Sequence, residues 1–112
     1  MAVWIGWAEV LVCGDYLSPV EIPTPEGGVD AYLATLVRLE PLVGAAAHVI
    51  PGHGGLIDGT RALELLGEDR AYLEALRSNP ASAPLPPLRR DREQRRLHAE
   101  NVARLLGPPA RK

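Results

Sequence analysis

The chain has 112 residues and a mass of 12.1 kDa, enough for one small domain and too few for two. Hydrophobic residues make up 46% of it and charged residues 23%, which is the composition of a folded globular chain and argues against disorder. The formal net charge of -2 excludes a basic field that would attract nucleic acid. No apolar run reaches the roughly 18 residues that a membrane span needs. We therefore expect neither nucleic acid nor a membrane as a partner.

The cysteine content and the first residues bear on location. Cys13 is the single cysteine, so it cannot form a disulfide within the chain, which fits a reducing compartment. The opening Met-Ala-Val-Trp-Ile-Gly lacks the basic segment followed by an apolar stretch that marks a secretory signal peptide. Together these features predict a cytoplasmic location.

The first elements expected along the chain are a hairpin and a helix. Residues 2–5 and 10–13 predict two strands, joined by a four-residue connection over residues 6–9. The unbroken apolar run at 10–13 is typical of a strand buried on both faces. After a loop rich in proline and glycine, hydrophobic residues recur every three or four positions from Val29. This spacing predicts an amphipathic helix that ends before Pro41.

The second half of the sequence predicts one more strand and two more helices. Residues 45–50 form the expected short buried strand, and Pro51-Gly-His-Gly-Gly follows it as a glycine-rich loop. Thr60 is the expected N-cap of the next helix. The last helix is expected from about Arg89 to Leu106, where Gly-Pro-Pro stops it.

This order of elements defines the expected fold class and domains. Strands alternating with helices predict an α/β fold, with a small sheet and flanking helices. We expect an α/β domain over residues 1–78 and a stiff linker over residues 79–88, which contain four prolines. The helix within residues 89–107 is expected to pack on that same domain.

Two strand ends carry residue types that can bind a metal ion. One is Val-Leu-Val-Cys-Gly-Asp15 and the other is His-Val-Ile-Pro-Gly-His53. Loops at strand ends commonly carry ligands, and glycine allows the backbone to approach an ion closely. An aspartate oxygen and a neutral histidine nitrogen are a mixture typical of catalytic zinc. A turn aspartate and a solvated histidine are the alternative interpretation, because two residues 38 positions apart do not define a site by spacing.

The same segments resemble a known family. Val-Leu-Val-Cys-Gly-Asp15-Tyr-Leu-Ser, a helix, Val-Ile-Pro-Gly-His53-Gly and a long helix look like the C-terminal half of a metallo-β-lactamase-fold hydrolase. The closing Arg-Leu-His-Ala-Glu-Asn101 segment is also similar to the last helix of that family. The resemblance covers nearly the whole chain and implies that the sheet and helices correspond to half of an αββα sandwich.

The resemblance implies a zinc-dependent hydrolase acting on a small-molecule substrate. In that family an aspartate like Asp15 bridges two metal ions, and a histidine like His53 binds the second ion. A bridging carboxylate offsets the repulsion of two dications, and the metal pair binds a hydroxide whose pKa falls toward about 7. Asp15 and His53 are therefore the expected catalytic and metal-binding residues.

The sequence also departs from the family. Its His-x-His-x-Asp-His motif is absent, and the chain has three histidines in all, His48, His53 and His98. At most two of the usual ligands are present, so we expect a C-terminal portion of such an enzyme. The expected partner is a second copy or a complementary N-terminal half. A second hypothesis is a non-catalytic interaction or scaffold domain that forms a homodimer. A third is a single-metal site that uses Asp15 and His53 from two copies of the chain.

The remaining candidates have simpler interpretations. Cys13 lies in an apolar strand and is expected in the core. His48 is expected to be a packed or edge residue, and His98 to be solvated or bonded to backbone. Residues 89–96 contain five arginines interrupted by two acids and have no aromatic residue, so a solvated helix face with ion pairs is favoured over a nucleic-acid patch.

Overall fold

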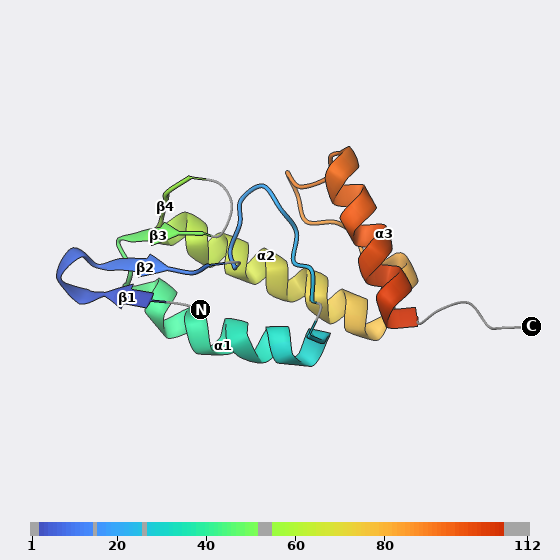
Figure 1. The fold of residues 1–112 in the computed structure, drawn as a ribbon, viewed down its shortest axis with the longest axis horizontal. Coiled ribbons are helices and arrows are strands. Elements are labelled where there is room, and N and C mark those ends of the chain that lie inside the picture. The colour runs from blue at the N-terminus through green and yellow to red at the C-terminus, as the bar shows by residue number, and fades with distance from the viewer. Residues whose placement is uncertain (1–2, 15, 26, 52–54, 107–112) are drawn as a thin grey trace, which may run out of the picture.

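The computed structural model describes residues 3–14, 16–25, 27–51 and 55–106 (Figure 1). The elements in chain order are β1 (Val3–Ile5), β2 (Val10–Val12), α1 (Val29–Ala45), β3 (His48–Ile50), β4 (Ile57–Asp58), α2 (Gly59–Ser78) and α3 (Arg92–Leu106). Short 3-10 turns cover Gly6–Ala8 and Pro80–Ser82. Within this part of the chain, none of the helices is long and apolar enough to cross a membrane.

The strands form a small mixed sheet in the order β1-β2-β3-β4. The expected hairpin is confirmed, since β1 and β2 pair antiparallel. β2 and β3 are parallel neighbours connected through α1, whereas β3 and β4 are antiparallel. The expected α/β class is therefore confirmed, with three helices and an open four-stranded sheet.

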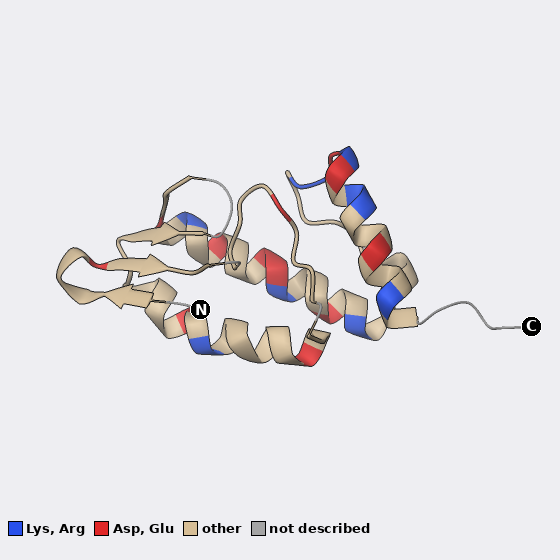
Figure 2. Ribbon diagram, viewed as in Figure 1, with Lys and Arg blue, Asp and Glu red and all other residues tan. Residues whose placement is uncertain are grey.

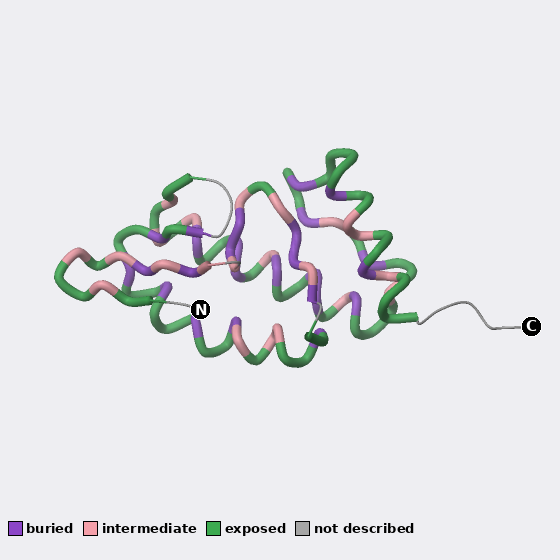
Figure 3. The backbone as a smooth tube through the Cα atoms, in the orientation of Figure 1, coloured by how far each residue is buried: buried purple, intermediate pink, exposed green. Residues whose placement is uncertain are grey.

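The two faces of this sheet differ in what covers them. The register aligns Trp4, Leu11, Val49 and Ile57 across the four strands on one face. Leu11 and Val49 are fully buried and belong to one hydrophobic core with residues of α1 and α2. Figure 3 shows buried positions recurring along α1 and α2.

The opposite face of the sheet is open and mostly apolar. It carries five β-branched apolar residues, Val3, Ile5, Val10, Val12 and Ile50, none of which belongs to the hydrophobic core. His48 and Asp58 are the polar residues aligned with them on β3 and β4. Val3 is 46% exposed and Ile50 is 40% exposed. The strands carry almost no charged residues, whereas charged residues are spread along α2 and α3 (Figure 2). A solvated sheet face normally carries polar residues, so the part of this face on β1 and β2, with the neighbouring Ile50, has the composition of a covered one.

Two strand predictions are wrong in part. The strand expected at 10–13 is not buried on both faces, because Leu11 and Cys13 face the core while Val10 and Val12 are only half-buried. The strand expected at 45–50 begins at His48, and only Val49 of its three residues is buried. Both corrections have the same cause: helices cover a single face of the sheet.

The first helix does not end before Pro41. It continues to Ala45 with Pro41 inside it, although proline removes one backbone hydrogen bond of the helix and crowds the preceding turn. Pro41 itself is exposed, and Val43, half a turn later, is fully buried in the core. Burial of the last turn offsets the lost hydrogen bond.

The other two helices begin at residues different from those expected. Asp58, and not Thr60, is the N-cap of α2, because its Oδ1 atom accepts a 2.7 Å hydrogen bond from the amide of Arg61. α3 begins at Arg92, since Asp91 Oδ1 accepts a 3.0 Å hydrogen bond from the amide of Gln94. A carboxylate at either helix start also interacts favourably with the helix dipole.

Candidate functional site

The carboxyl ends of β2 and β3 lie side by side. Val12 is aligned with Ile50 in the parallel register, and the amide of Cys13 donates a 2.8 Å hydrogen bond to the carbonyl oxygen of Ile50. Two segments thus leave the sheet at the same edge, one through Gly14 and the other through Pro51. The crevice beyond such strand ends is where open α/β sheets commonly bind ligands.

The two expected metal ligands, Asp15 and His53, lie outside the described residues, directly after these two strand ends. Of the glycines expected to turn the chain here, Gly14 is described and has φ 63°, which is in the left-handed region. Gly52 lies outside the described residues. Side-chain positions at the expected metal site therefore stay predictions, whereas the shared edge of β2 and β3 is established.

Cys13 ends the buried side of β2. It is fully buried, as expected, and desolvation raises the pKa of its thiol to about 11. A thiol with this pKa is almost wholly protonated at neutral pH, which disfavours Cys13 as a nucleophile. Beside it, Tyr16 packs edge-on against Tyr32 of α1, with ring centroids 4.9 Å apart, and helps to hold the segment after β2.

A metal ion is the group that the expected residues would hold. Within the described residues, no group of three or more His, Cys, Asp or Glu side chains could hold one. Asp15 and His53 have donor atoms suited to zinc, but catalytic zinc generally has three protein ligands, and a dinuclear centre needs more. The residues of this chain therefore do not fit a complete centre, and further ligands would have to come from another polypeptide segment.

The other histidines lie in different surroundings from those expected. His48 is exposed on the open face of the sheet, aligned with Asp58 of β4. His98, on α3, is not bonded to backbone: its Nδ1 atom lies 2.7 Å from the hydroxyl oxygen of Tyr72 on α2. That hydroxyl also accepts a 3.1 Å hydrogen bond from Nδ2 of Asn101, so its own proton is free to point to His98.

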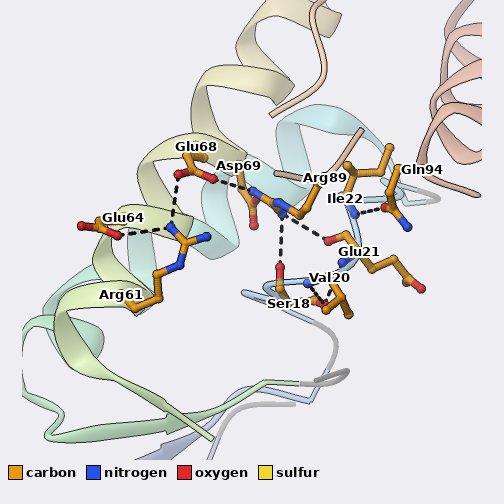
Figure 4. A network of polar contacts seen from close by, with 10 residues as sticks. All are labelled: Ser18, Val20, Glu21, Ile22, Arg61, Glu64, Glu68, Asp69, Arg89 and Gln94. Carbon is orange, nitrogen blue, oxygen red and sulfur yellow. Dashed lines mark hydrogen bonds and ion pairs between the residues drawn. The ribbon is translucent and has the colours of Figure 1, made fainter. Parts of the chain in front are cut away.

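A second cluster of functional groups surrounds Arg89 at the middle of α2 (Figure 4). We call it the Arg89 cluster; it consists of Arg61, Glu64, Glu68, Asp69 and Arg89. The Nη1 atom of Arg89 lies 2.7 Å from Oδ1 of Asp69, and its Nη2 atom donates a 3.1 Å hydrogen bond to Oε1 of Glu68. On the outer side, Arg61 pairs with Glu64 at 3.2 Å and with Glu68 at 3.3 Å.

The same guanidinium also fixes the segment that follows β2. Nη1 of Arg89 donates 3.2 Å hydrogen bonds to the carbonyl oxygens of Ser18 and Glu21 (Figure 4). Arg89 is completely buried and Asp69 is 1% exposed. Burial raises the pKa of Asp69 to about 7, although the neighbouring Arg89 lowers it.

The Arg89 cluster corrects one sequence interpretation. Arg96 fits the expected solvated helix face, because it pairs with Glu93 and Glu100 on the surface of α3. Arg89 lies before that helix and is buried. One signal in the sequence could have revealed it: Asp69 lies on the same stripe of α2 as Leu65, Leu66, Tyr72 and Leu73, and an acid on an apolar stripe requires a buried partner.

Two hollows in the described part lie away from the ends of β2 and β3. One of about 340 Å³ is next to the start of α1, where Arg77 pairs with exposed Asp30. The other, of about 250 Å³, lies between α2 and the proline-rich residues 84–87. Comparisons of the chain with protein families, with curated proteins and with solved structures give no match.

Proposed function

We propose that this chain is the C-terminal portion of a metal-dependent hydrolase of the metallo-β-lactamase superfamily, acting on a small-molecule substrate. Asp15 is the proposed bridging ligand and His53 the proposed ligand of the second metal ion, which is zinc. The observation that carries the proposal is the parallel pairing of β2 with β3. It makes the chain leave one edge of one sheet at Gly14 and at Pro51, the described residues next to the two proposed ligands, which are 38 residues apart in the sequence.

The open face of the sheet supports the incomplete nature of this unit. Val3, Ile5, Val10, Val12 and Ile50 form an apolar layer without a partner among the described residues. In the αββα sandwich that the sequence resembles, a second sheet covers such a face. We therefore propose that a complementary N-terminal half covers it and supplies the missing ligands.

Metal retention tests the proposed ligands. The chain, purified without chelator and supplied with zinc, is analysed by native mass spectrometry beside Asp15→Ala, His53→Ala and the control His48→Ala, whose exposed side chain lies on the sheet. The proposal is supported if the original chain and the control retain zinc and both ligand variants lose it. Zinc that the original chain and both ligand variants bind equally, or that only the control loses, contradicts the ligand assignment.

A non-catalytic scaffold domain is the second candidate function, and the open apolar face favours it. In that case a second copy covers the face, as a twofold homodimer, the commonest closed assembly. Val12→Lys places a charge in the middle of the face, and Val37→Lys places one on the exposed side of α1 as a control. A dimer in sedimentation experiments that Val12→Lys alone dissociates supports this function, and a monomeric original chain contradicts it.

A further inference from the structure

Residues 16–25, which we call the exit segment, lead from the end of β2 toward α1 and form neither helix nor strand. Several of them are nevertheless buried: Leu17, Ser18, Ile22, Pro23 and Pro25. Buried backbone N–H and C=O groups need hydrogen-bond partners, and a segment outside helices and sheets must find them in turns, side chains or water. The conformation of the exit segment therefore depends on which side chains supply those partners.

Arg89 of the C-terminal arm, defined here as residues 79–106, supplies two of them. Its Nη1 atom donates 3.2 Å hydrogen bonds to the carbonyl oxygens of Ser18 and Glu21 (Figure 4). Ser18 closes a turn within the segment, because its Oγ atom accepts hydrogen bonds from the amides of Val20 and Glu21 at 3.2 and 3.0 Å. One side chain of the segment and one of the arm thus hold the backbone over residues 18–21.

Gln94 and Asn101 on α3 supply two more partners. Gln94 Oε1 accepts a 2.7 Å hydrogen bond from the amide of Ile22, and Asn101 Nδ2 donates one of 2.9 Å to the carbonyl oxygen of Pro23. Within the described residues of the arm, the buried polar side chains are those of Arg89, Gln94 and Asn101. Each of the three therefore bonds to the backbone of the exit segment.

Apolar side chains also attach the arm to the rest of the molecule. Four of them are buried or packed against the hydrophobic core: Ala83, Leu85, Leu97 and Val102. This packing is separate from the polar bonds to the exit segment. Removal of one such bond should therefore loosen the exit segment while the arm stays docked.

Unfavourable backbone conformations adjoin the bond between Arg89 and Ser18 on both sides. Leu17, directly before Ser18, has φ 63°, and Leu88, directly before Arg89, has φ 68°. Leucine disfavours this left-handed region. Leu88 is also 86% exposed while the charged Arg89 is completely buried, which reverses the usual preference of both residue types. Such conformations persist where the surrounding contacts impose them.

We propose that the C-terminal arm is a clamp that holds the exit segment in one conformation through Arg89, Gln94 and Asn101. The exit segment begins where β2 and β3 end, and open α/β sheets commonly bind ligands beyond such strand ends. Helix α3 lies at the end of α2 away from the sheet (Figure 1), so the clamp links a distant part of the molecule to this edge. It acts whether or not a metal ion binds, so failure of the proposed zinc site would leave this inference intact.

Hydrogen exchange of single amides, measured by NMR at one pH, tests the clamp. Gln94→Met keeps the length of the side chain but removes the acceptor of the Ile22 amide, so exchange at Ile22 should accelerate. The informative amides are those of Val20 and Glu21, which bond to Ser18 and not to the arm. A clamp predicts that they accelerate too, by at least about fivefold, the equivalent of one ordinary hydrogen bond. Amides of α1 and α3 should keep their original rates.

Two controls and a second variant accompany this measurement. Gln94→Glu keeps an acceptor in the first turn of α3, where a negative charge is favourable, and should restore slow exchange at Val20 and Glu21. Arg95→Met alters an exposed neighbour and should change none of these rates. Asn101→Leu, which removes the donor to Pro23, should reproduce the effect of Gln94→Met.

Three results would overturn the proposal. The first is unchanged exchange at Val20 and Glu21 while Ile22 accelerates, which would mean separate contacts in place of a clamp. The second is an equal acceleration of the α1 amides, which would mean a general loss of stability. The third requires no variant: in the original chain, Val20, Glu21 and Ile22 should open with one shared opening constant, and widely different constants would contradict a single held unit.

Discussion

The amide of Cys13 donates a 2.8 Å hydrogen bond to the carbonyl oxygen of Ile50, one residue beyond the aligned pair Val12 and Ile50. This bond extends the pairing of β2 with β3 to the last residue before the chain turns at Gly14, where φ is 63°. The two strands that precede the proposed metal ligands in the sequence are thus bonded to each other up to Cys13 and Ile50. Backbone hydrogen bonds and the buried Cys13 side chain hold this edge together.

The Cys13 thiol should react slowly with water-soluble thiol reagents. Its side chain is fully buried, and desolvation raises its pKa to about 11 from an ordinary value of 9.0. The thiolate is then about 100-fold scarcer at pH 8 than in an exposed cysteine, and burial adds a steric barrier. Ellman's reagent at pH 8 measures the rate, with the chain in denaturant as the control. Equal rates in the folded and unfolded chain would contradict a buried thiol.

Asp58→Ala should lower the free energy of unfolding by about 1 kcal/mol. The substitution removes the acceptor for the amide of Arg61 and the negative charge at the start of α2. Urea denaturation measures the change, and Thr60→Ala is the matched control because Thr60 is exposed and makes no cap. The assignment of the cap would be wrong if the Thr60 variant lost more stability than the Asp58 variant.

The fold class could be predicted from the sequence because its signals are local. The apolar runs at 3–5 and 10–12 and the helical spacing from Val29 lie within single elements. The errors arose where tertiary packing decided the outcome. Pro41 stays inside α1 because Val43 is buried, and β3 is buried on one face only because helices cover a single side.

Of the two candidate sites, one follows from local sequence signals and the other depends on tertiary packing. The alternation of strands and helices could suggest that Asp15 and His53 follow neighbouring strands. β2 and β3 are indeed parallel neighbours. The Arg89 cluster could not be anticipated in this way. It unites Ser18, Asp69 and Arg89 from three distant parts of the sequence, and a run of arginines does not reveal which member is buried.

Arg89→Met should lower the free energy of unfolding by about 3–5 kcal/mol, because it leaves Asp69 buried without its partner. The double variant Arg89→Met with Asp69→Leu should recover most of that loss, since apolar replacement of a whole buried pair is often neutral. Urea denaturation provides both values. Arg96→Met, which breaks exposed pairs with Glu93 and Glu100, should cost far less, because solvent screens those pairs. A similar loss of unfolding free energy in the Arg89 and Arg96 variants would show that burial of Arg89 does not add to stability.

Protonation of His98 should weaken the attachment of α3. Burial raises the pKa of Tyr72, so its hydroxyl stays protonated and can donate to Nδ1 of neutral His98. A protonated imidazole has no acceptor at Nδ1, so the Tyr72 hydroxyl can no longer donate to it and must accept from both Nδ1 and Asn101. Partial burial lowers the pKa of His98 below its ordinary 6.5, so unfolded chain binds the proton more tightly. The stabilisation from neutral His98 is therefore full above pH 6.5 and is lost as the pH falls through the folded pKa.

The test of His98 requires a chain in which the Arg89 cluster does not titrate, because burial raises the pKa of Asp69 to about 7, close to the range of the test. In Asp69→Asn, exchange protection of the α3 amides should fall as the pH drops from 6.5 to 5. Adding His98→Gln should remove this fall, whereas adding His48→Gln should leave it unchanged, since His48 is exposed on β3 far along the chain from α3. NMR of the His98 ring should give a midpoint below 6.5 that rises in urea. A midpoint at or above 6.5 in the folded chain would mean that Tyr72 does not favour the neutral ring.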